Sequence, residues 1–169
     1  MKTIWLGIGM AAAALFGAPA NAQSAEFLKK FKDWSAYRNA ADGTAFCFSV
    51  SQPRDTEPKG LTRGEVYFYV SQYPADKVQN EISIKLGYIA KPGVNVVVTV
   101  GADTFNFFSK DDKAFIEKPD VERKFVEAMK KADKMVVRAK SVKGTDTTDV
   151  FSLQGAGPAA QLATDSCKG

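Results

Sequence analysis

The sequence of 169 residues contains no histidine. Histidine is the commonest general base and a frequent ligand of zinc and haem, so its absence excludes His-based catalytic triads and His-ligated metal centres. Nucleotide-binding turns are missing as well, because the segments GADTFNFF and KGTDTTD lack the required glycine spacing. The sequence therefore predicts a non-enzymatic protein with no catalytic residue, no cofactor and no metal site.

Aspartate pairs are the remaining candidates for a metal site, at Asp111-Asp112 and at Asp146 and Asp149. Neither pair supplies the regular oxygen spacing of a calcium-binding loop. Aspartate is also common at hairpin turns, where its side chain bonds to nearby backbone groups. We therefore predict that these four residues are solvated turn residues.

Long apolar runs are scarce, and the one from Ile4 to Phe16 begins two residues after Lys2. Ala20-Asn21-Ala22 then fits the small-x-small rule of signal peptidase sites. A membrane-spanning helix needs about 20 apolar residues, more than this run provides. We predict a cleaved secretory signal peptide over residues 1–22, with cleavage between Ala22 and Gln23, and a single mature domain over 23–169. The mature protein is expected in the periplasm, or secreted to the cell surface, with no integral membrane segment.

Charge of one sign is not concentrated strongly anywhere, and the formal net charge of +4 is spread over alternating signs. The densest basic stretch runs from 124 to 143, but acidic residues interrupt it and it spans a predicted helix and the next strand. We expect it to be a solvated surface rather than a site for nucleic acid or anionic lipid. Its members are Lys124, Lys130, Lys131, Lys134, Arg138, Lys140 and Lys143.

Cysteine occurs at positions 47 and 167 alone. Two cysteines in one exported chain usually form a disulfide, and Cys47–Cys167 is the only possible intramolecular pair. This bond would fix a chain end that would otherwise fray. A redox-active pair is disfavoured, because the short Cys-x-x-Cys spacing is missing.

Alternation of apolar and polar residues between turns is abundant and predicts short strands. The clearest example is NEISIKLGY, which places Ile82, Ile84 and Leu86 on one face. A meander is expected from Val94 to the turn near 110–113. Further strands are expected over 34–38, 45–51, 66–71, 135–140 and 150–153, with a charged, proline-containing loop over 52–64. About eight or nine short antiparallel strands predict a mainly β fold, a sandwich or a barrel.

Two segments instead predict helices. KPDVERKFVEAMKKAD repeats apolar residues at helical spacing, with Asp120 as the expected N-cap. An Ala-rich helix over 158–165 is expected to carry Cys167 back towards Cys47. The mainly β fold should therefore contain one helix between late strands and one short C-terminal helix.

Aromatic residues gather in EVYFYVSQYP. We expect Phe68 in the core, while Tyr67, Tyr69 and Tyr73 are candidates for an exposed recognition face. A strand buried on both sides is the alternative interpretation.

The order of motifs along the mature chain is distinctive: DWSAY, CFSVSQP, TRGEVYFYVSQYP, NEISIKLGY, VGADTFNFFSKDDKAF, FVEAMKKADKMVV, SVKGTDTTDVFSLQG and an Ala-rich end with Cys. This succession resembles the invasion-associated locus B family over nearly the whole mature chain. The resemblance implies an exported bacterial β-sandwich without an established enzymatic activity. Two positions depart from the family pattern: Ala132-Asp133 stands where a Gly turn is expected, and Ala156 where a larger apolar residue is expected.

Taken together, these features predict an exported protein that binds an unknown envelope or host protein through sandwich loops or an exposed strand edge. A structural or stress-related envelope protein without a specific ligand is the first alternative. An enzyme that uses Ser, Asp or Lys without His is the second.

Overall fold

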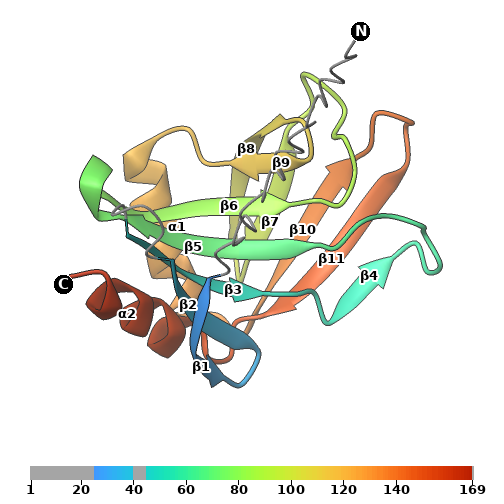
Figure 1. The fold of residues 1–169 in the computed structure, drawn as a ribbon. Coiled ribbons are helices and arrows are strands. Elements are labelled where there is room, and N and C mark those ends of the chain that lie inside the picture. Colours follow the sequence, from blue (N-terminus) through green and yellow to red (C-terminus); the bar gives the residue numbers. More distant parts are fainter. Residues whose placement is uncertain (1–24, 40–44, 169) are drawn as a thin grey trace, which may run out of the picture.

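The computed structural model describes residues 25–39 and 45–168. The predicted signal peptide and its cleavage site at Ala22 and Gln23 lie outside the described residues. The described chain contains these elements in order (Figure 1): β1 (Glu26–Phe31), β2 (Trp34–Asn39), β3 (Phe46–Ser51), β4 (Asp55–Glu57), β5 (Tyr67–Tyr73), the 3-10 turn η2 (Pro74–Asp76), β6 (Val78–Lys85), β7 (Val96–Val100), β8 (Asp103–Lys110), β9 (Lys113–Phe115), α1 (Pro119–Met129), β10 (Lys134–Lys140), β11 (Asp146–Ser152) and α2 (Ala156–Ser166).

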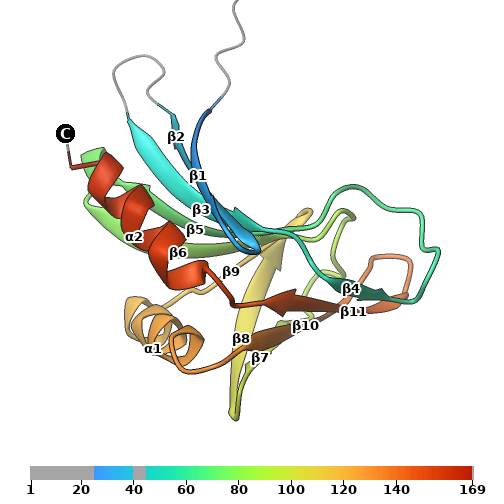
Figure 2. The ribbon, with the colours of Figure 1, turned by 90° about the horizontal axis from the view of Figure 1, so that it is seen from below.

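All neighbouring strands pair antiparallel in one 11-stranded sheet of order β1-β2-β3-β5-β6-β9-β8-β7-β10-β11-β4. The sheet folds over at β8 and β9. β1, β2, β3, β5 and β6 form one layer, β7, β10 and β11 with β4 at the edge form the other, and the core lies between them (Figure 2). β1 and β4 are the two edge strands and do not pair with each other, so the sheet is open and sandwich-like rather than a closed barrel. The predicted mainly β fold with two helices is confirmed.

The described chain has more strands than the eight or nine expected, because β1 and β4 were not predicted. β1 is largely exposed and carries charges at the sheet edge, so its sequence EFLKKF lacks an alternating apolar pattern. β4 lies inside the segment predicted as a loop and forms by pairing with β11 over three residues. Long-range pairing, rather than local pattern, creates both strands.

The core confirms the predicted alternation, since Ile82, Ile84 and Leu86 are all fully buried. The first strand of the meander was expected to begin at Val94, but β7 begins at Val96 and Val94 is 38% exposed. Trp34 joins the two halves of the sandwich, because its indole Nε1–H donates to the carbonyl oxygen of Ser152 at 2.9 Å.

α1 closes one side of the core with an apolar face centred on Phe125, which stacks on Phe68 with ring centroids 5.8 Å apart. The predicted N-cap was wrong: Lys118 occupies that position, and Asp120 lies within the first turn. Pro119 explains the earlier start, since proline fits the first helical position, where its missing N–H has no intrahelical partner to lose. Asp120 then provides a negative charge near the positive end of the helix dipole.

α2 packs against β2 and β3, with Ala159 and Ala163 fully buried. Gly155 precedes it with a φ of 92°, and a Cβ there would stand 1.8 Å from the carbonyl oxygen of Phe31. Only glycine permits this approach, which sets the start of α2 against the end of β1.

Candidate binding surface

The most distinctive surface feature is a set of aromatic side chains on the outer side of β1, β2, β3 and β5. In β3, residues alternate between buried Cys47 and Ser49 and half-buried Phe46 and Phe48, so the phenylalanines point away from the core. We call the whole set the aromatic face, and it consists of Phe27, Tyr37, Phe46, Phe48, Tyr67, Tyr69 and Tyr73.

The rings of the aromatic face contact one another across the strands. Tyr37 and Phe48 stack with centroids 5.2 Å apart and an interplanar angle of 11°. Phe46 stacks on Tyr73 at 5.6 Å, and Phe27 meets Tyr37 edge-on at 5.5 Å. Such pairs stabilise a sheet by roughly 0.2 to 1 kcal/mol each. Stacking within the aromatic face covers part of each ring. The face is therefore better suited to a broad contact with a large partner than to stacking against the single ring of a small ligand.

Tyr69 and Tyr73 of the aromatic face are neutral at physiological pH. Burial raises the pKa of Tyr69 above its ordinary value, and the neighbouring Tyr67 adds to the rise. Burial likewise raises the pKa of Tyr73, with a further contribution from Glu81. Their hydroxyls can therefore donate as well as accept hydrogen bonds.

Structure and sequence agree on part of this surface. Phe68 is fully buried, as predicted, and the candidate residues Tyr67, Tyr69 and Tyr73 are half-buried on the outer side. The contributions from β1 to β3 were not predicted. Two of these residues could have been inferred from the sequence. Phe46 and Phe48 flank Cys47, and successive residues of a strand point to opposite sides, so a buried Cys47 places both rings on the outer side.

The predicted disulfide residues meet at the end of α2. The sulfurs of Cys47 and Cys167 are 2.05 Å apart and the Cα atoms 5.8 Å apart. Cys47 is fully buried, and both cysteines pack with Ala163 in a small cluster separate from the main core. The bond therefore joins α2 to β3 where few other apolar side chains do so.

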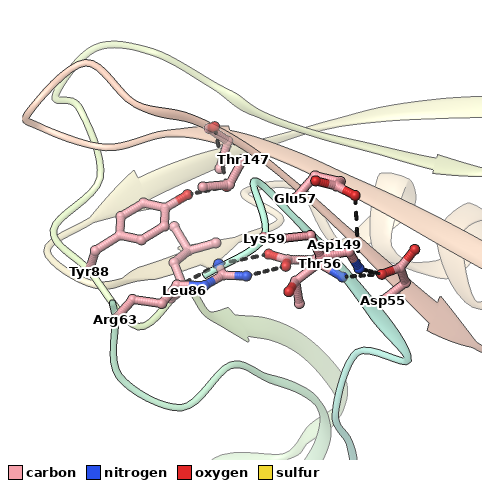
Figure 3. Close-up of polar contacts among 10 residues, drawn as sticks. Asp55, Thr56, Glu57, Lys59, Arg63, Leu86, Tyr88, Thr147 and Asp149 are labelled. Carbon is pink, nitrogen blue, oxygen red and sulfur yellow. Dashed lines mark hydrogen bonds and ion pairs between the residues drawn. The ribbon is translucent and has the colours of Figure 1, made fainter. Parts of the chain in front are cut away.

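An ion pair joins loop 52–64 to β11 and shows that one prediction was wrong. Asp149 is not a solvated turn residue: its side chain is fully buried and paired with Arg63, whose side chain is 8% exposed (Figure 3). A guanidinium nitrogen of Arg63 donates to Asp149 Oδ2 at 3.0 Å and to the Leu86 carbonyl at 3.3 Å. These contacts attach loop 52–64 to β11. We therefore assign a structural role to the Arg63–Asp149 ion pair.

Tyr88 lies beside this ion pair. Its hydroxyl is 2.5 Å from the Thr147 Oγ1, and the Arg63 guanidinium lies 5.8 Å from its ring centroid (Figure 3). Burial raises the pKa of Tyr88. The network is internally satisfied, which fits a clamp on the loop rather than a ligand site.

Small side chains on α2 leave a largely apolar hollow of about 220 Å³ between the two helices, which Val70 of β5 also lines. Ala156 and Ala160 line one wall, and Val126 and Met129 line the other. Ala156, which stands where the family pattern has a larger apolar residue, is one of the small side chains that line the hollow.

Metal ligands do not gather in the part of the chain that the structure describes: no three His, Cys, Asp or Glu residues there lie close enough to hold an ion. Within residues 25–39 and 45–168, no helix is long and apolar enough to cross a membrane.

The fold and the aromatic face define an open, sandwich-like β domain closed by two helices. No family model matches the chain. No curated protein matches it either. A solved structure does share the fold, the crystal structure of invasion associated protein B from Bartonella henselae, with a TM-score of 0.60. The match covers 83% of this chain and 96% of that one at 14% sequence identity. It supports the fold that the resemblance implied, and at this identity it shows the fold alone.

Proposed function

We propose that the protein is an exported, non-enzymatic binding protein whose aromatic face contacts a partner in the bacterial envelope or on a host cell. The observation that carries the proposal is the aromatic face itself. These large rings lie outside the sandwich, where the core does not require them. Aromatic residues are enriched at protein interfaces, because they combine apolar area with little loss of conformational freedom. The fold shared with invasion associated protein B is compatible with this role.

A structural or stress-related envelope protein without a ligand is the second candidate. Ring contacts within the aromatic face favour it, since they stabilise the sheet without any partner. Partial exposure of the same rings argues for the binding role. The two candidates differ in whether removing the rings costs binding or only stability.

Replacing Tyr69 and Phe48 by serine should abolish most partner capture. Immobilised chain starting at Gln23 is incubated with envelope and host-membrane extracts, and captured material is quantified by mass spectrometry. We expect at least a tenfold loss in the double variant, because central contacts dominate interface energies. A far-UV circular dichroism spectrum and melting curve check that the variant is folded.

The matched control is Ile89→Ser with Val142→Ser, since both residues are exposed apolar residues in loops outside the aromatic face. This control should capture as much as the unsubstituted chain. Equal capture by both double variants, or no specific capture at all, would favour the structural candidate.

The proposed export also predicts the N-terminus of the protein. The exported protein should begin at or near Gln23, because Ala20 and Ala22 occupy the small-residue positions of the cleavage rule. Intact-mass measurement on protein from the periplasm and the medium tests this. Retention of residues 1–22 would instead indicate a protein tethered by its apolar run.

A further inference from the structure

The apolar hollow between the helices lies apart from the aromatic face. α1 contacts β6, β7 and β8, whereas α2 contacts β1, β2, β3 and β5, so each helix rests on its own strands (Figure 2). Val70 lines the hollow of about 220 Å³ and is buried on the inner side of the sheet, whereas the neighbouring Tyr69 belongs to the aromatic face. The hollow is therefore on the opposite side of β5 from the proposed binding surface.

Apolar side chains line the hollow without filling the space between the helices. Four of them come from α1 and α2: Val126, Met129, Ala156 and Ala160. Protein interiors are close-packed, and side chains that border an unfilled space lose dispersion contacts. A hydrocarbon group in the hollow would restore these contacts. An apolar cavity of about 150 Å³ holds a benzene ring, so this larger one accommodates a hydrocarbon chain on the order of eight carbons.

A polar hollow of about 610 Å³ adjoins the apolar one, between α1 and the start of β6. The linings of the two hollows share Asn80, Val126 and Lys130. Charges of both signs line the polar hollow, at Lys77, Glu122, Arg123, Glu127 and Lys130.

These charges disfavour a ligand head of either sign. Lys130 is already paired with Glu127 at 2.6 Å. An anionic head would lie near Glu122, and a cationic head would lie near Lys77 and Arg123. The amide side chains of Gln79 and Asn80 also line the polar hollow, and amides exchange hydrogen bonds with hydroxyl groups. A neutral head that carries hydroxyl groups, such as a sugar or glycerol, is therefore the best match.

We infer that the two hollows form a site for a single-chain amphiphile with an uncharged, hydroxyl-bearing head. The hydrocarbon chain lies between α1 and α2 beside Val70, and the head lies between α1 and the start of β6. Apolar contacts supply most of the affinity in such sites, and a few polar groups fix the orientation of the ligand. The inference goes beyond the proposed function, because it does not involve the aromatic face.

Two methionines in the described part of the chain make the site observable. Met129 lines the apolar hollow, whereas Met135 is fully buried in β10 and lines neither hollow. The chain starting at Gln23 is labelled at its methionine methyl groups and titrated with octyl glucoside below the critical micelle concentration. In nuclear magnetic resonance spectra we expect the Met129 signal to shift and saturate, and the Met135 signal to stay in place. Glucose alone should shift neither signal.

Ala160→Leu fills the apolar hollow and should weaken the binding of octyl glucoside by roughly tenfold or more, because the added side chain occupies the volume of the hydrocarbon chain. An unmoved Met135 signal shows that the core of this variant is intact. Gly157→Leu is a second blocking variant, since Gly157 lines the hollow and a Cβ added there has open space around it. The control Lys124→Leu adds a leucine at an exposed position of α1 that lines neither hollow, and it should bind like the unsubstituted chain.

Several outcomes would overturn the site. They are equal shifts of both methionine signals, a Met129 shift that does not saturate, unchanged affinity in both α2 variants, and an equal loss of affinity in the α1 control. Octanoate that binds as tightly as octyl glucoside would overturn the assignment of a neutral head.

Discussion

Alanine in place of Asp149 is expected to lower the free energy of unfolding by about 3–5 kcal/mol. Asp149 is fully buried and Arg63 nearly so, and the guanidinium also donates to the Leu86 carbonyl. Removing the carboxylate leaves a buried cation without its counter-charge, and that uncompensated charge causes the loss. Urea unfolding followed by circular dichroism measures it.

Two further variants test whether the loss of stability comes from a buried charge left without its partner. Arg63→Ala should cost a similar amount, because it strands the buried carboxylate. The double change Arg63→Met with Asp149→Leu should cost much less than either single change, because neither charge is then stranded. Single variants within about 1 kcal/mol of the unsubstituted protein would contradict the structural assignment of this pair.

Serine at Cys47 or at Cys167 should each lower the free energy of unfolding by about 2–5 kcal/mol. The bond ties α2 to β3, and α2 has 11 residues, too few to persist as an isolated helix in water. The double variant should be little worse than either single variant, because one bond is lost in all three. Denaturant unfolding in oxidising buffer provides the comparison.

Reducing the unsubstituted protein is the control for the cysteine variants, and it should reproduce the stability of the double variant. Both thiols should resist alkylation before reduction. Ready alkylation of two thiols in protein kept under oxidising conditions would contradict the pairing. A much larger effect at Cys47 would show that this fully buried side chain acts mainly by packing.

Local sequence pattern was sufficient wherever one side of a strand faces the core. Ile82, Ile84 and Leu86 alternate in the sequence and are buried together in the structure. It was insufficient where a distant partner defines the element. β4 becomes a strand because β11 offers it hydrogen bonds, and its own sequence contains only Asp, Thr and Glu.

The same limit applies to the candidate binding surface. The tyrosines of β5 form a local pattern and were identified from it. Phe46 of β3 and Tyr73 of β5 are far apart in the sequence, and their contact follows from the pairing of β3 with β5. Asp149 looked like a turn residue for the same reason, because its partner Arg63 comes from a loop much earlier in the chain.

The contact between Gly155 and Phe31 has a consequence for the order in which the molecule can be assembled. It sets the start of the last helix against the end of the first strand, while Cys167 fixes the far end of that helix to β3. A chain delivered from its N-terminus therefore presents β1, β2 and β3 long before α2 arrives to cover them. Folding of this domain is complete only when α2 is present, so a chain that still lacks α2 remains unfinished and accessible to chaperones and proteases.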